Sequence, residues 1–314
     1  MMGDDDGSSV HDEHLMSSPR PPASAALGAA MCFGLWGVLP IYWKQLGGLG
    51  SDMAVAHRIT WTMVWVIPML LYTGRWGSWL RSIKEPGMLR LHAWSALLLG
   101  INWSTFVWAA QHGHILDSSL GYFINPLLNV VIGFALLGER LTRLQKVSVG
   151  FAAVGALMQV VLAGRFPWVG LVLAFSMGFY ALARRRSPLG ALSGLAMETL
   201  AGLPFALLYL VWAALQGRAV WGPGQPWDYS LIIGLGAITA VPLVGFANGA
   251  RMLPFAMLGL LQFLTPTGHF LIATMVYHEP VNAGALGSFA LIWVGVAVFC
   301  TDLWQRSRKV NPDD

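Results

Sequence analysis

Charge is scarce in this sequence. Only 11% of its 314 residues are charged, whereas soluble globular chains carry about 25%. Apolar and aromatic residues make up 56% of the chain, and its mean hydropathy is +0.60. This composition excludes a soluble domain, a coiled coil, a collagen-like chain and a nucleic-acid-binding protein. It predicts an all-α membrane protein whose main partner is the lipid bilayer.

Cysteine and recognisable catalytic motifs are also scarce. Cys32 and Cys300 both lie inside apolar segments, so neither a disulfide framework nor a metal cluster is predicted. The chain has no phosphate-binding glycine loop and no serine elbow, which argues against ATP-driven transport and against an enzyme. Residues 11–14 are interpreted as a solvated charge run, and His112 and His114 make a weak metal claim. We therefore expect no cofactor and no metal.

Long hydrophobic segments are what the sequence has instead. About 20 apolar residues are needed to cross about 30 Å of hydrocarbon, and the chain contains ten such segments. They leave residues 1–23 as a disordered tail and residues 304–314 as a second polar tail. The ten predicted membrane helices cover residues 24–45, 52–73, 89–110, 117–138, 144–163, 167–184, 190–214, 229–250, 256–277 and 282–303.

The basic residues support this number of helices. Alternate loops lie on opposite sides of the membrane. Of the 19 lysine and arginine residues, all but four fall in the two tails or in the loops and segment ends on the same side as the tails. Of the four, Lys44, Arg165 and Arg218 lie in the other set, and Arg58 lies within a segment. Because basic loops stay on the cytoplasmic side, both termini are predicted to be cytoplasmic.

The two halves of the hydrophobic region align when the chain is shifted by 140 residues. This predicts two repeats of five helices, residues 24–163 and 164–303. Because five is an odd number, the second repeat must be inverted in the membrane. The aligned pairs include Phe123 with Phe263, Pro126 with Pro266, Glu139 with Glu279 and Gly155 with Gly295.

Polar side chains occupy one face of the fourth segment and the equivalent face of the ninth. Each face also carries a proline, which removes a backbone donor and predicts a kink or a free carbonyl. Inverted repeats meet near the bilayer midplane, so these faces are predicted to line a substrate cavity. The alternative is that they only join packed helices. The residues are Tyr122, Asn125 and Asn129 with Pro126, and Gln262, Thr265 and His269 with Pro266.

Charges within the segments form a second group of candidates. Arg58 and Glu198 fall at equivalent repeat positions, and His57 precedes Arg58. A charge at the centre of a membrane helix costs about 2.5–3.5 kcal/mol on insertion scales, so each must face a partner or water. One interpretation is coupling to a substrate, a proton or another ion. The other is a buried charge that specifies the fold. A direct Arg58–Glu198 salt bridge would require tilted helices.

Secondary transport by alternating access is the function that these features favour, with a small-molecule substrate moving between the repeats. The alternatives are a membrane-embedded enzyme and a non-transporting scaffold. An enzyme would need converging catalytic groups, whereas Glu198 is the one deep carboxylate in the sequence. Trp36, with Gly34 and Gly37 beside it, is a candidate stacking wall for the cavity.

Several motifs resemble one known family. The residues 117–140 (DSSLGYFINPLLNVVIGFALLGER), 56–60 (AHRIT) and 34–44 (GLWGVLPIYWK) are similar to the RarD branch of the EamA family, in the drug/metabolite transporter superfamily. The resemblance implies inverted five-helix repeats, a bacterial inner-membrane location and efflux of metabolites or drugs. It also implies a central cavity lined by Asn102, Trp103, Tyr122, Asn125, Asn248, Gln262 and Thr265.

Overall fold

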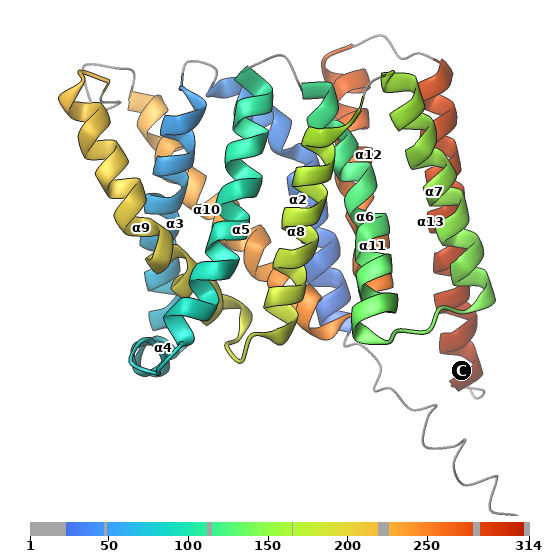
Figure 1. Cartoon of the computed structure of the whole chain (residues 1–314), viewed down its shortest axis with the longest axis horizontal. Helices are drawn as coiled ribbons and strands as arrows, with labels where there is room; N and C mark the ends of the chain where they lie inside the picture. Colours follow the sequence, from blue (N-terminus) through green and yellow to red (C-terminus); the bar gives the residue numbers. More distant parts are fainter. Residues whose placement is uncertain are drawn as a thin grey trace, which may run out of the picture.

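The computed structural model describes residues 23–46, 49–111, 115–164, 166–218, 226–278 and 283–310; the predicted tail at residues 1–22 lies outside them. The described part is all-helical and contains no β-strand. Its long helices cross one bundle from end to end (Figure 1). The elements are α2 (Ala23–Gln45), α3 (Ser51–Tyr72), α4 (Trp76–Ile83), α5 (Met88–Gln111), α6 (Ile115–Leu137), α7 (Arg143–Ala163), α8 (Trp168–Arg186), α9 (Ala191–Leu215), α10 (Pro226–Met252), α11 (Phe255–Gln262), α12 (Leu264–Leu271), the π-helical η1 (Ile272–Val276) and α13 (Ala283–Val310).

Each of the ten predicted segments coincides with one long helix or, in one case, with a run of short ones. The prediction of an all-α, polytopic membrane fold is confirmed. Within the part of the chain that the structure describes, six spans are long and apolar enough to cross a membrane: Ala23–Gln45, Asp52–Tyr72, Arg143–Leu162, Ala191–Leu215, Tyr229–Met252 and Phe255–Val276. Two further helices, α6 and α13, contain shorter apolar stretches.

The ninth segment is divided into α11, α12 and η1. Pro266 has no N–H to donate to the carbonyl of Gln262, and α11 ends at that residue. Pro126, its repeat counterpart, lies inside α6, which continues without interruption. The short helix α4 was not predicted; it lies across the end of the bundle at which α13 also ends (Figure 1).

The helices that pack together form equivalent pairs in the two halves of the chain. The 140-residue shift matches α2 with α8, α3 with α9, α5 with α10, α6 with α11–α12, and α7 with α13. Thus α2 packs on α10 as α8 packs on α5, and α3 packs on α10 as α9 packs on α5. Likewise α6 packs on α8 as α12 packs on α2. The pairs α3–α9, α6–α11 and α7–α13 map onto themselves. The packing therefore has an approximate two-fold relation.

The contact between α7 and α13 shows this relation at single residues. A Cβ added to Gly155 would lie 2.8 Å from the carbonyl oxygen of Ser288, and one added to Gly295 would lie 2.7 Å from that of Ser148. Both pairs of positions differ by 140 residues. Small residues let membrane helices approach closely. In this contact a glycine of each helix lies against a backbone carbonyl of the other helix.

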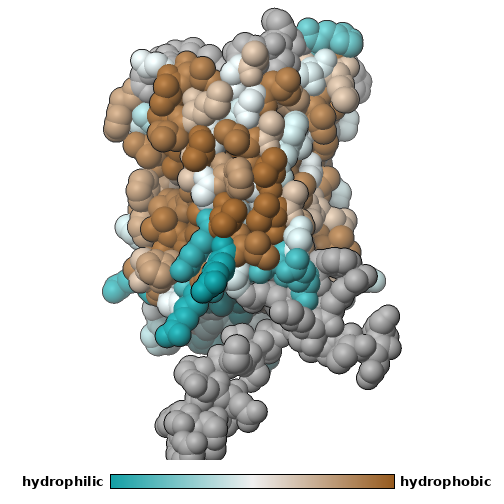
Figure 2. All heavy atoms as spheres, turned by 90° about the vertical axis from the view of Figure 1, so that its right-hand side faces the viewer, coloured by the Kyte–Doolittle hydropathy of each residue, from teal (hydrophilic) through white to brown (hydrophobic). Residues whose placement is uncertain are grey.

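The outer face of α7 and α13 is apolar over most of its height, with polar side chains gathered near its ends (Figure 2). Exposed apolar side chains on α7 include Val147, Val154, Leu157 and Val161. An apolar surface of this height suits contact with lipid chains.

Candidate functional site

The predicted polar faces of α6 and α11 meet inside the bundle. Asn129 donates a hydrogen bond from Nδ2 to Oε1 of Gln262 at 2.9 Å, and both side chains are buried. The side-chain oxygens of Asn125 and Asn129 are also buried and have no hydrogen-bond partner among the described residues. An unpaired buried acceptor costs about 1–3 kcal/mol. The contact between α6 and α11 therefore contains two amide oxygens that could accept hydrogen bonds from a polar ligand or from water.

The rest of the polar face reaches α2. Thr265 Oγ1 donates to the carbonyl of Phe33 at 2.9 Å, and His269 Nε2 lies 3.1 Å from the carbonyl oxygen of Trp36. The ring of Tyr122 meets that of His269 edge-on, with centroids 5.2 Å apart. These contacts join α2, α6 and α12, so the residues form one polar belt and also hold the helices together.

Arg58 lies in a cluster formed by α3, α5 and α10. Its Nε donates to Thr239 Oγ1 at 2.7 Å, and its guanidinium carbon lies 4.1 Å from the ring centroid of Trp103. A guanidinium over an indole face is attracted by the ring quadrupole. No carboxylate within the described residues pairs with Arg58. The neighbouring His57 is buried. The positive charge of Arg58 thus has no counter-ion among the described residues.

Asn102, on α5, joins this helix to α8 through hydrogen bonds. Its Nδ2 donates to the carbonyl of Leu173 and to Ser176 Oγ, both at 3.0 Å. Both acceptors belong to α8, so this amide connects the third segment to the sixth.

Glu198, on α9, accepts hydrogen bonds from three side chains that belong to two helices, α5 and α8. Its Oε1 accepts from Ser95 at 2.7 Å and from Arg184 Nη1 at 3.4 Å, and its Oε2 accepts from Tyr180 at 3.1 Å. The ion pair is buried on both sides. Arg184 also donates to the carbonyl of Gly190 at 3.1 Å. Arg58 and Glu198 therefore do not pair with each other.

Arg184 is one of the residues that the sequence did not point to. It was counted with Arg185 and Arg186 as a charge at the end of a segment, but the structure buries it inside the bundle. The available signal was its position four residues after Tyr180, which places both side chains on one face of α8. Both of them reach Glu198.

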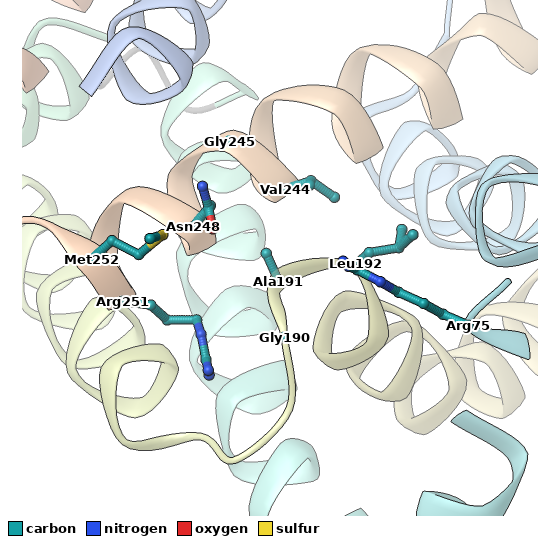
Figure 3. A pocket seen from close by; sticks show the side chains of 9 residues that line it. All are labelled: Arg75, Gly190, Ala191, Leu192, Val244, Gly245, Asn248, Arg251 and Met252. Carbon is teal, nitrogen blue, oxygen red and sulfur yellow. The ribbon is translucent and has the colours of Figure 1, made fainter. Parts of the chain in front are cut away.

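A cleft of about 540 Å³ opens at the end of the bundle where α9 begins and α10 ends (Figure 3). Asn248 is the one predicted cavity residue that lines it. Its other walls come from the start of α9, from α10 and from the residue before α4. The lining residues are Arg75, Gly190, Ala191, Leu192, Val244, Gly245, Asn248, Arg251 and Met252.

A much smaller cavity, of about 40 Å³, lies between α3, α5 and α9. It is lined by Glu198 and Trp103 together with Thr62, Thr199 and mostly apolar neighbours. The Arg58 cluster and the Glu198 cluster thus border one internal space, through Trp103 and Glu198 respectively.

The opposite end of the bundle is held by polar contacts. Asp52 Oδ2 accepts hydrogen bonds from Arg218 Nη2 at 2.6 Å and from the hydroxyl of Tyr209. The hydrogen bond and charge of Asp52 raise the pKa of Arg218 above its usual value. Lys44 Nζ lies 3.5 Å from the ring centroid of Tyr277. These contacts join α3 to the residues after α9, and α2 to the residue after η1.

Metal binding has no support within the described residues, because no three His, Cys, Asp or Glu side chains come together there. His112 and His114, the weak metal candidates of the sequence, lie outside the described residues, and so does the charge run at residues 11–14. Glu279, the repeat counterpart of Glu139, lies outside them as well.

Comparison with known proteins gives consistent matches. The sequence profile of the "EamA-like transporter family" matches residues 21–161. An "Uncharacterized transporter PA0485" from Pseudomonas aeruginosa is 40% identical over 280 residues, which is 88% of this chain and 93% of the relative. A "Protein RarD" from Streptomyces exfoliatus is 36% identical over 278 residues, 88% of each chain. A crystal structure that is 22% identical has a TM-score of 0.68, covers 88% of this chain and 96% of its own, and supports the fold.

Proposed function

Since the chain belongs to the EamA-like transporter family, we propose that it is a secondary transporter that exports small metabolites or drug-like molecules by alternating access. The observation that carries this proposal is Arg58, an arginine within a membrane helix that has no counter-ion among the described residues. It lies where helices of the two halves meet, since α3 and α5 belong to one half and α10 to the other. A mobile ligand is the partner that such a charge lacks.

The two halves are residues 24–163 and 164–303, inserted with opposite orientations. The symmetric set of packed helices supports this division, and so does the repeated glycine contact between α7 and α13. In such a pair of inverted units, one half rocks against the other around a site at their interface.

The proposal locates the protein in the bacterial inner membrane with both termini in the cytoplasm. The distribution of basic residues supports this orientation. It makes the cleft at Asn248 the cytoplasmic entrance, while the contact between Asp52 and Arg218 closes the external end. Substrate entry from the cytoplasm is what an exporter requires.

The polar belt forms the substrate path in this proposal. Asn125 and Asn129 offer their unpaired oxygens to the substrate. The surrounding wall consists of Trp36, Asn102, Trp103, Tyr122, Asn248, Gln262, Thr265 and His269. The backbone hydrogen bonds that Pro126 and Pro266 cannot donate give α6 and the divided ninth segment freedom to bend. During transport, the side chains of the belt would break their hydrogen bonds to neighbouring helices and form hydrogen bonds to the substrate.

Coupling is assigned to Arg58 with His57, and Glu198 is assigned to holding the fold. A histidine can change its charge between pH 5 and 8, so His57 next to Arg58 suits coupling to a proton. Glu198 already has Arg184 as its counter-ion, which leaves it less able to exchange a proton or a ligand.

The first test compares metabolites inside and outside cells that express the wild-type protein, Arg58→Gln, or the control Arg90→Gln on the exposed surface of α5. We expect at least one metabolite to be depleted inside and enriched outside with the wild type and the control, and not with Arg58→Gln at equal membrane abundance. If no metabolite differs between wild-type cells and cells without the protein, export is refuted. A metabolite converted without crossing the membrane would indicate the membrane enzyme instead.

The second test locates the path. Cysteines are introduced singly for Tyr122, Asn125, Gln262 and Thr265 in a background with Cys32 and Cys300 replaced by alanine, and membranes are treated with a polar thiol reagent. We expect labelling at these positions and none at the buried control Ala152→Cys in the contact between α7 and α13. If none of the four positions reacts, the path lies elsewhere.

A further inference from the structure

The cleft at the start of α9 differs from the polar belt in its charge. Two arginines, Arg75 and Arg251, line it, and no carboxylate is among its lining residues. Arg251 Nη1 donates to the carbonyls of Ser187 and Leu189, which are neutral acceptors and leave its charge uncompensated. Arginine stays protonated in proteins, so the cleft has two permanent positive charges.

Neither charge is cancelled from nearby. Arg75 is exposed, and no described side chain accepts a hydrogen bond from it. Arg184, behind the start of α9, is matched by Glu198 and adds no net charge. The cleft thus has two positive charges and no carboxylate among its lining residues, and it opens at the end of the low-dielectric bundle, an arrangement that attracts anions.

The geometry directs these charges at one place. A Cβ added at Gly190 would lie 3.9 Å from Arg75 Nη1, so this guanidinium reaches the start of α9. Figure 3 shows the side chain of Arg75 extending toward Leu192 from one side, and Asn248 and Arg251 on α10 across the cleft. Gly190 provides no side-chain cap, so the first amides of α9 add donors on the same wall. The volume of about 540 Å³ suits a small organic molecule.

We infer that this cleft binds the anionic group of the transported molecule, so that the substrate class is a small organic anion such as a carboxylate. The inference rests on the proposed transport function and names its substrate class. Arg75 and Arg251 attract the anionic group, and Asn248 contacts the body of the molecule on its way to the polar belt.

The test uses two probes that differ only in charge, N-acetylphenylalanine as its carboxylate and N-acetylphenylalanine amide. Their binding to the full-length protein is measured by equilibrium dialysis in nanodiscs of phosphatidylcholine. We expect the carboxylate to bind about tenfold more tightly than the amide. Arg75→Gln and Asn248→Asp should each remove most of this preference, and Arg90→Gln, away from the cleft, should keep it.

Three outcomes decide the inference. Equal binding of the two probes, or a preference that survives both Arg75→Gln and Asn248→Asp, would overturn it. A second set of nanodiscs contains phosphatidylglycerol, because a lipid headgroup also offers an anionic group. If this lipid abolishes carboxylate binding, and Arg75→Gln releases the lipid from the purified protein, a headgroup and not a substrate occupies the cleft.

The transport proposal and this inference fail in different ways. If the metabolites exported in cells are all neutral or cationic, the inference fails while transport stands. If no metabolite is exported but the carboxylate preference follows Arg75, the cleft binds anions and transport is refuted.

Discussion

Arg58 and Glu198 occupy equivalent positions in the two halves, 140 residues apart, but their surroundings differ. Glu198 accepts hydrogen bonds from three side chains, and one of them, Arg184, carries the opposite charge. Arg58 contacts a hydroxyl and an indole ring, and no carboxylate among the described residues balances it. If the chain transports as proposed, the two equivalent positions differ in role: Glu198 serves the fold, and Arg58 serves the substrate.

The physical basis of this difference is the cost of charge in a membrane. A buried ion pair with its remaining hydrogen bonds satisfied forms a rigid unit, and removing one member leaves the other uncompensated. A charge without a counter-ion is stabilised only in part by a hydroxyl and a ring, so an anion that reaches it gains the missing interaction. Stability should therefore depend on Glu198 and transport on Arg58.

The largest predicted effect is on stability at Glu198. Glu198→Gln should lower the free energy of unfolding by about 3–5 kcal/mol, because Arg184 would remain buried without its counter-ion. Thermal unfolding in detergent measures this loss, and Glu85→Gln at an exposed position is the control. Combining Glu198→Gln with Arg184→Met should restore part of the stability. Wild-type stability of Glu198→Gln would remove the distinction between the two charges.

The next effect is on transport at Arg58. Arg58→Gln should reduce export of the metabolite identified by the first test about tenfold or more, because the proposed contact between the positive charge and the substrate is lost. Its unfolding temperature should change little, since one hydrogen bond contributes about 0.5–1.5 kcal/mol. Export that is unchanged, or a loss that only follows lower membrane abundance, would place Arg58 with Glu198 as a structural residue.

A smaller effect tests the repeat on which the comparison depends. Gly155→Ala and Gly295→Ala should each destabilise the protein by about 1–3 kcal/mol, because the added methyl group overlaps a carbonyl of the facing helix. Thermal unfolding should show similar losses for both variants, with Gly150→Ala, where an added Cβ meets open space, as the control. Strongly unequal losses would argue against a symmetric contact between α7 and α13.

The smallest effect is expected at the external end. Asp52→Asn removes an ion pair between exposed side chains, which salt screens, so the unfolding temperature should hardly change. The Asp52→Asn variant should instead increase labelling of Tyr209→Cys by a polar thiol reagent added from outside, compared with Tyr209→Cys alone, since an amide in place of the carboxylate no longer forms the ion pair with Arg218. Unchanged labelling would mean that this contact does not restrict the external end.

The polar belt was largely visible in the sequence. The spacing of Asn125 and Asn129, and of their counterparts after the shift, predicted polar faces, and the structure brings Asn129 to Gln262. The cleft was visible only in part, since Asn248 was named while Arg75 and Arg251 were interpreted as markers of topology. Their role depends on which way each side chain points, and a single sequence contains no signal for that.

The sequence by itself determined the all-α membrane fold, the ten segments and the family, because hydrophobic length, loop charge and local motifs are properties of neighbouring residues. Only the tertiary structure decided that Arg184 neutralises Glu198 and that Arg58 stacks on Trp103. Residue pairs such as Arg58 and Thr239 are far apart in the chain, and helix tilt and rotation decide whether they meet. Burying a charge in a membrane is costly, so whether a charged side chain contacts a counter-ion decides whether we expect it to be structural or functional.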